Sequence, residues 1–195
     1  NYMKIPFHIV LSKFLVAITS LFLFYSCTEG KTGETKDIVE EPAKMNVRVT
    51  DNISDMLSSL EEEEKFDDST VLHLYAAINN YYEKNNYEAI WCNNEQLLAT
   101  SDSLLRFIEN ARLYGLFPND YHYNVLTTIV NRFAADTAAV GDRRDAALWS
   151  KADILFTDAF FTISKHLNIG RLKPDSMFMR PDSVLTDDFY FAQMD

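Results

Sequence analysis

The sequence is poor in glycine and in positive charge. Only five glycines occur among 195 residues, and neither GxGxxG nor GxxxxGK[ST] is present, so no phosphate-binding loop of these types is expected. The 18 Lys and Arg residues are outnumbered by 29 Asp and Glu residues, and the net charge is -11. A chain of this charge repels nucleic acid phosphates, and we therefore expect no nucleic acid partner. No internal repeat of fixed period is found either.

Cysteine and histidine are also scarce, and their spacing does not indicate a metal or cofactor site. His73, His122 and His166 have neither the i, i+4 spacing nor the cysteine partners of a zinc site, so we expect surface or capping roles. We predict no bound metal and no cofactor. Cys92 has no sequence signal for an adjacent base, which favours a place in the core over a role as nucleophile. If Cys27 carries lipid, Cys92 has no disulfide partner.

The longest apolar stretch of the globular region runs from Leu148 to Pro174 and predicts a central helix. Its apolar residues recur at steps of three and four, and aromatic residues widen the apolar face. The pattern consists of Leu148, Ala152, Leu155, Ala159, Ile163 and Leu167, widened by Trp149, Phe156 and Phe160. A narrow solvated strip is expected at Lys151, Asp158, Lys165 and Asn168. Gly170 provides a left-handed cap. We predict an all-α helical bundle around this helix.

Acidic and aromatic residues on the predicted helices do not indicate a catalytic site. Asp153 and Asp158 are five positions apart, do not share a helix face, and are not expected to form a paired-carboxylate acid–base site. The 10 tyrosines and 14 phenylalanines are expected mainly in the core, with a glycan groove as the alternative.

The N-terminal region predicts a secretion signal at 1–27. The apolar run at 14–25 follows Lys4 and Lys13 and precedes Cys27. The segment resembles a bacterial lipoprotein signal, in which Cys27 becomes the lipid-bearing first mature residue. The alternatives are ordinary secretion with cleavage nearby, or an uncleaved anchor. We expect the mature protein in the cell envelope, on the periplasmic side, anchored to the membrane.

An acidic flexible tether is predicted at 28–69, because this range contains the run Glu61 to Glu64 and lacks a sustained apolar period. A short helix at 52–60 is conceivable but too brief to stand alone. The helical domain is expected at 70–195. A further helix is expected to begin at Thr186 or Asp187, and because no stop signal follows it, we expect an N-terminal fragment of a longer protein.

Within the helical domain, four further features are predicted from turn and cap residues. A helix on Leu72 to Tyr82 ends at Asn85 and Asn86, and 87–91 continues as a short extended piece. Thr100 or Ser101 caps the next helix, which Gly115 ends. Pro118 and Asp120 turn the chain into a helix at 121–135, and 137–144 is a loop.

Three segments carry a resemblance to a known family. They are YYEKNNYEAIW at 81–91, ARLYGLFPNDYH at 111–122 and DILFTDAFFTISKHLNIGRLKP at 153–174. In order and spacing they are similar to the helical scaffold region on the N-terminal side of murein L,D-transpeptidases of the YcbB type. The most specific pieces are the G-L-x-P-x-D-Y-H run at 115–122 and the L-x-T-D-A-F…G-R-x-x-P run at 155–174. The resemblance covers about 71–175.

This resemblance implies that the full-length protein cross-links peptidoglycan stem peptides through a cysteine acyl-enzyme. In that family the chemistry lies in a separate catalytic domain with an S-H-G-C-type motif, which this sequence does not contain. The resemblance therefore assigns no catalytic residue to this chain. The expected partners are the missing catalytic domain, peptidoglycan, and the membrane through the N-terminal anchor.

The residues that match the family are structural or docking candidates. Gly115 is expected as a cap, Pro118 and Asp120 as turn formers, Asp158 as a polar contact, and Gly170 with Arg171 at the end of the central helix. Arg171, Tyr121 and His122 are further expected at the surface, facing the missing domain or glycan. The main alternative function is a non-enzymatic helical envelope lipoprotein that binds a protein partner or glycan. A third possible function is that of a hydrolytic enzyme that uses Cys92.

Overall fold

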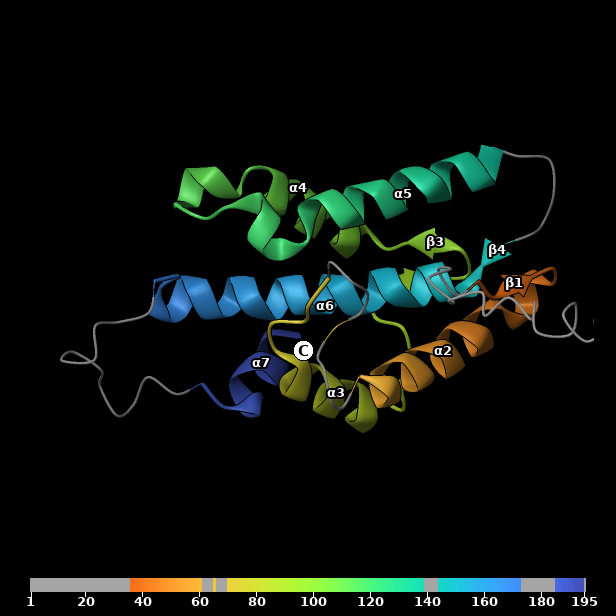
Figure 1. Cartoon of the computed structure of the whole chain (residues 1–195), viewed down its shortest axis with the longest axis horizontal. Coiled ribbons are helices and arrows are strands. Elements are labelled where there is room, and N and C mark those ends of the chain that lie inside the picture. Colours follow the sequence, from red (N-terminus) through yellow and green to blue (C-terminus); the bar gives the residue numbers. More distant parts are fainter. Residues whose placement is uncertain (1–35, 61–64, 66–69, 139–143, 173–184, 195) are drawn as a thin grey trace, which may run out of the picture. The chain divides into compact units, whose positions relative to one another are not determined.

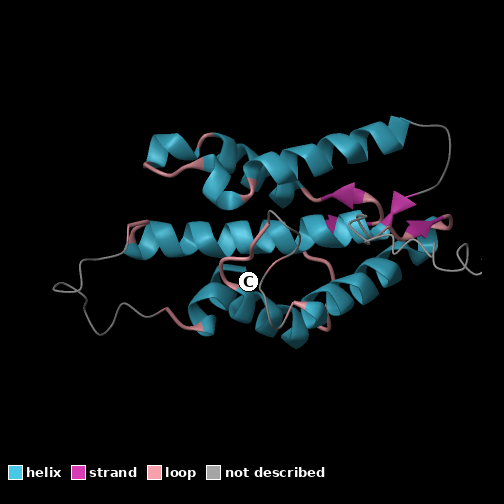
Figure 2. Ribbon diagram, viewed as in Figure 1, coloured by secondary structure: helices cyan, strands magenta, loops and turns pink. Residues whose placement is uncertain are grey.

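The computed structural model describes residues 36–60, 65, 70–138, 144–172 and 185–194. These residues are mostly helical, which confirms the predicted all-α class (Figures 1 and 2). The α-helices are α2 (Met45–Ser59), α3 (Tyr75–Lys84), α4 (Ala99–Glu109), α5 (Tyr123–Ala138), α6 (Ala146–Ile169) and α7 (Asp187–Met194). Short 3-10 helices are η1 (Pro42–Lys44), η2 (Ala111–Tyr114) and η3 (Pro118–Tyr121). The predicted signal and Cys27 lie outside the described residues.

Two antiparallel pairs of short strands accompany the helices. Strand β1 (Ile38–Val39) pairs with β4 (Arg144–Asp145), and β2 (Cys92–Asn93) pairs with β3 (Gln96–Leu97). Asn94 and Glu95, between β2 and β3, both have positive φ (46° and 64°), as a tight two-residue hairpin turn requires. Of the extended piece predicted at 87–91, Tyr87 still belongs to the turn after α3 and has positive φ, residues 88–91 are irregular, and the strand begins only at Cys92.

Helix α6 is the central element, and it contacts each of the other described α-helices. All side chains from Ala146 to Ala159 are buried except Lys151, as expected for a helix that others cover on most sides. Asp158 is 0% exposed, so its predicted place on a solvated strip is wrong. Of the helices that the structure describes, α6 included, none has the length and apolarity needed to span a bilayer.

The end of α6 differs in detail from the predicted left-handed cap. Gly170 follows the helix with φ 90° and ψ 156°, which is outside the left-handed helical region. This combination belongs to a region of backbone space that is essentially restricted to glycine. Glycine is thus required at this position, although for a conformation other than the predicted one. The last helix begins at Asp187, as predicted.

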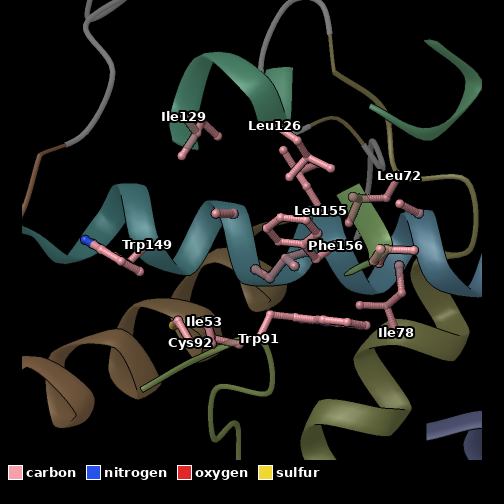
Figure 3. Close-up of a cluster of buried hydrophobic side chains, with 14 of the residues drawn as sticks. Ile53, Leu72, Ile78, Trp91, Cys92, Leu126, Ile129, Trp149, Leu155 and Phe156 are labelled. Carbon is pink, nitrogen blue, oxygen red and sulfur yellow. The ribbon is translucent and has the colours of Figure 1, made fainter. Parts of the chain in front are cut away.

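The core forms where α2, α3, α5, α6 and the β2–β3 hairpin meet. Figure 3 shows this cluster, with aliphatic side chains from the surrounding helices packed around aromatic side chains of α6 and the hairpin. Its labelled members are Ile53, Leu72, Ile78, Trp91, Cys92, Leu126, Ile129, Trp149, Leu155 and Phe156. On α5, Phe133 stacks on Trp149 of α6, with ring centroids 3.7 Å apart and planes at 7°.

Helix α2 is part of this core, which corrects the predicted tether. Met45, Val49, Ile53 and Leu57 are buried at steps of four, and this face packs against α6. The hydroxyl of Ser150 on α6 donates to the carbonyl oxygen of Val49 at 3.1 Å. The prediction of a flexible tether is therefore wrong for 45–60, because tertiary burial stabilises a helix that is too short to stand alone.

The chain before α2 is held by Asp37. Its carboxylate accepts two hydrogen bonds from Arg48 at 2.8 and 3.0 Å and one from Asn52 at 2.8 Å, all from α2. The bond to Arg48 lowers the pKa of Asp37. Its backbone N–H donates to Asp145 Oδ1 at 3.0 Å, and its carbonyl oxygen accepts from the N–H of Ala146 at 2.7 Å. The folded unit therefore extends N-terminal to the predicted start at 70.

The start of α4 also differs from the prediction. The helix begins at Ala99, after Leu98, and no side chain caps it. Ser101, predicted as a cap, is buried within the first turn, and its hydroxyl donates to the carbonyl oxygen of Trp91. Ser101 therefore connects α4 to the start of the hairpin.

The role of α2 in the fold can be tested with Ile53→Ala. Ile53 is 0% exposed, and we expect its truncation to lower the free energy of unfolding by about 2–5 kcal/mol. The control on the same helix is Val47→Ala at a position 62% exposed, where a change within about 0.5 kcal/mol is expected. Chemical denaturation measures both. Equal small effects would mean that α2 does not contribute to the cooperative core.

Candidate functional site

Two fully buried aspartates of α6 accept hydrogen bonds from the backbone on either side of α3. Asp158 Oδ1 accepts from the N–H groups of His73 at 2.9 Å and Leu74 at 3.0 Å, just before the helix. Asp153 accepts from the N–H groups of Ile90 at 3.0 Å and Trp91 at 2.8 Å, after it. The two carboxylates lie in separate environments, so they do not form a paired acid–base site. Together they position both ends of the α3 segment.

A histidine–aspartate cluster forms around Asp158, consisting of His73, His122 and Asp158. His122 Nε2 is hydrogen-bonded to Asp158 Oδ2, and the rings of His73 and His122 stack with centroids 5.4 Å apart and planes at 18°. His122 is 9% exposed and has φ 57° at the corner between η3 and α5. The predicted surface role of His122 is therefore wrong. No local spacing revealed the cluster, because its members come from three distant segments.

Tyr121, the residue before His122, is also buried, and its predicted place at the surface is wrong. Its hydroxyl lies 2.9 Å from Nδ1 of His166 on α6. Burial raises the pKa of Tyr121 to about 12, and burial, with Lys165 nearby, lowers the pKa of His166. Both shifts favour a neutral pair in which Tyr121 donates to His166. Tyr121 thereby joins η3 to the C-terminal half of α6.

Arg171, just beyond α6, lies at the surface as predicted. Its Nε donates to Asp120 Oδ2 of η3, and its guanidinium lies 4.4 Å from the centre of the Phe117 ring. Pro118 is the first residue of η3, where its missing N–H costs no hydrogen bond. The end of α6 and the η3 turn are thus connected at the surface by Arg171 and in the interior by Tyr121.

Helix α4 ends at Glu109, before the predicted stop at Gly115, and Gly115 instead ends η2. Gly115 has φ 73° and ψ 16°, in the left-handed conformation that favours glycine. The N–H of the following Leu116 donates to the carbonyl oxygen of Ala111 at 3.1 Å. Leu116 is 4% exposed, which is the apolar contact expected after a glycine cap.

Cys92 lies beside the second buried aspartate. Asp153 also accepts a hydrogen bond of 2.6 Å from the Tyr82 hydroxyl. Burial raises the pKa of Asp153, while its hydrogen bonds to Tyr82, Ile90 and Trp91 oppose that shift. Burial and the neighbouring Asp153 charge raise the pKa of the Cys92 thiol far above its usual range. Cys92 therefore lacks the thiolate character that a nucleophile needs. Its predicted place in the core is confirmed.

An apolar groove of about 1070 Å³ lies where α4, α6 and α7 converge. Its lining includes Trp91, Leu104, Phe107, Phe160, Leu167 and Phe189. Leu167 is 55% exposed and Leu98, also in the lining, is 38% exposed. Outside the groove, Leu113 and Tyr114 of η2 are exposed, and Tyr114 stacks on Phe107. Large apolar side chains are therefore exposed both in the groove and beside it, on η2.

The comparisons with known proteins found a family match for one part of the chain. A protein-family model described as "Scaffold domain" matches residues 76–192, from α3 to α7. No curated protein and no solved structure matches the sequence. The matched range contains both buried aspartates, the η3 corner and all of the groove lining except Gln193 and Met194, whereas α2 precedes it.

The structural role of Asp153 can be tested with Asp153→Asn. The amide has one acceptor oxygen where the carboxylate has two, so a backbone N–H of Ile90 or Trp91 loses its partner. We expect a loss of about 1–3 kcal/mol in the free energy of unfolding. Asp55→Asn, at an exposed position of α2, is the control and should stay within about 0.5 kcal/mol. Matching denaturation curves for the two variants would contradict this role.

Proposed function

Because the chain belongs to the family of the L,D-transpeptidase scaffold domain, we propose that it is the scaffold portion of an enzyme that cross-links peptidoglycan stem peptides. The observation that carries this proposal is the family match over 76–192, more than half of the 195 residues. The match falls on the helices that pack around α6. The residues that resemble the family by sequence lie in the same range.

We place the chemistry in a catalytic domain outside this chain. L,D-transpeptidation needs a thiolate that attacks the stem-peptide carbonyl, forms an acyl-enzyme and passes the acyl group to an acceptor amine. Cys92 does not meet that need, since it is buried and its pKa is raised. In this proposal the scaffold contributes a rigid surface that positions the catalytic domain or its substrate.

The apolar groove between α4, α6 and α7 is our candidate for that surface, and the rest of the enzyme is the proposed occupant. Interfaces between domains of one chain commonly use apolar patches of this kind. A glycan is a less suitable occupant, because sugars stack on exposed aromatic faces and Trp91 of the lining is only 5% exposed. A non-enzymatic envelope lipoprotein that binds a separate protein partner here is the alternative.

The place of the protein in the cell is also a proposal. The apolar run at 14–25 and Cys27 support an envelope protein held at the membrane by lipid, on the periplasmic side. That position brings the domain to peptidoglycan. Mass spectrometry of the mature N-terminus tests it directly, because a lipid-modified Cys27 is expected as the first residue, and an unmodified or absent Cys27 would contradict lipidation.

The enzymatic proposal is tested by expressing the whole gene product in cells that lack their own L,D-transpeptidases. We expect cross-links of the L,D type to appear among muropeptides analysed by mass spectrometry. The whole product with its catalytic cysteine replaced is the control and should give none. If the expressed and folded protein forms no such cross-links, the non-enzymatic alternative is favoured.

The groove is tested with Leu167→Glu in the same gene product. This position is 55% exposed, so the fold should tolerate the change, while a charge buried against the docked domain costs several kcal/mol. We expect at least about a tenfold loss of L,D-cross-linking. Leu113→Glu, at a position 80% exposed outside the groove, is the matched control and should retain activity. Equal activity of both variants would exclude the groove as the docking surface.

A further inference from the structure

The histidine–aspartate cluster joins three potential metal ligands from separate elements. His73 precedes α3, His122 forms the corner between η3 and α5, and Asp158 lies in the second half of α6. Each offers one ligand atom, and these atoms lie within 4.8 Å of one another. His73 lies outside the range of the family match, so the match does not assign this cluster.

The donor set suits one class of metal ion. Two imidazole nitrogens and one carboxylate oxygen, with water in the fourth position, form a common tetrahedral zinc site with an open coordination position. Calcium and magnesium need six or more oxygen ligands, which these three residues do not supply. The cluster therefore fits Zn²⁺ better than an alkaline-earth ion.

Two of the three ligands are held in place by the fold. Asp158 Oδ1 accepts the N–H groups of His73 and Leu74, which leaves Oδ2 to face His122. Hydrogen bonds of this kind to a ligating carboxylate are the outer-shell support found at metal sites. His122 is buried, and its backbone at φ 57° is fixed between η3 and α5. Both side chains are therefore oriented before any ion arrives.

The third ligand, His73, is exposed and able to move. Within the part of the chain that the structure describes, its ring stacks on His122 and its ring nitrogens make no hydrogen bond. His73 also lines a pocket of about 410 Å³ that contains Lys165 and Asp187, one charge of each sign. Of the three ligands, His73 is therefore the one that faces solvent, and the other two are buried behind it.

From this geometry we propose that His73, His122 and Asp158 bind one Zn²⁺ ion. The ion accepts lone pairs from a nitrogen of each imidazole and from Asp158 Oδ2. Nε2 of His122 gives up the proton that it shares with Asp158, and the imidazole binds in its neutral form with its one proton on Nδ1. Zinc–ligand bonds of about 2.0–2.2 Å place tetrahedral ligand atoms about 3.4 Å apart. His122 Nε2 and Asp158 Oδ2 therefore move apart from 2.5 Å as bonds to zinc replace their hydrogen bond, and His73 rotates toward them from at most 4.8 Å. The bound ion ties the start of α3 to the η3 corner and to α6.

The test uses the full chain after treatment with a chelator, with Zn²⁺ alone as the probe. Isothermal titration calorimetry should give one ion per chain, and Zn²⁺ should raise the melting temperature. Co²⁺ in its place should show the visible absorption of a tetrahedral site. Absence of binding by the folded chain, or a stoichiometry above one with no change in melting temperature, would overturn the proposal.

His73→Ala is the decisive variant, because this side chain is exposed and its loss leaves the hydrogen bonds of Asp158 intact. We expect at least about 100-fold weaker Zn²⁺ binding, because loss of a direct ligand costs no less than loss of an outer-shell partner, with the metal-free melting temperature unchanged. His166→Gln is the histidine control and should bind Zn²⁺ like the unaltered chain. Unchanged affinity in His73→Ala, or equal loss in both variants, would reject this ligand set.

Discussion

The structure depends on two carboxylates that α6 carries into the interior. A buried aspartate is stable only if its oxygens are hydrogen-bonded, and because other helices surround α6, water is not available to Asp153 or Asp158. Backbone N–H groups before and after α3 supply most of the partners. The same hydrogen bonds satisfy N–H groups of irregular chain, which would otherwise be buried without partners. The same hydrogen bonds thus stabilise the buried carboxylates and fix the irregular segments on either side of α3.

This arrangement extends to the surface where we place the function. Ile90 and Trp91, bound to Asp153, also line the apolar groove, and Ser101 connects Trp91 to α4 on its other side. The groove wall is therefore positioned by the interior polar contacts. A scaffold domain benefits from such rigidity, since a docking surface that is already ordered loses less conformational entropy on binding.

Asp158 serves the fold and the proposed zinc site through different oxygens. Oδ1 is committed to the backbone before α3, while Oδ2 faces His122. The metal therefore leaves the hydrogen bonds of Oδ1 in place and replaces only the hydrogen bond between Oδ2 and His122. Cys92, beside Asp153, has no such second role. Burial raises the pKa of its thiol and thereby makes the side chain unreactive.

The sequence by itself determined the features that depend only on residues close together in the chain. The apolar period predicted α6, and Gly170 predicted its end. The family resemblance, over about 71–175, covered most of the range 76–192 that the family model matches. Tertiary structure alone decided which faces are covered. Helix α2 is stable because α6 covers it, Tyr121 and His122 are interior because η3 folds onto α6, and His73 meets His122 through Asp158. Periodicity reports which residues share a face of one helix, whereas burial and long-range contacts depend on what other segments place against that face.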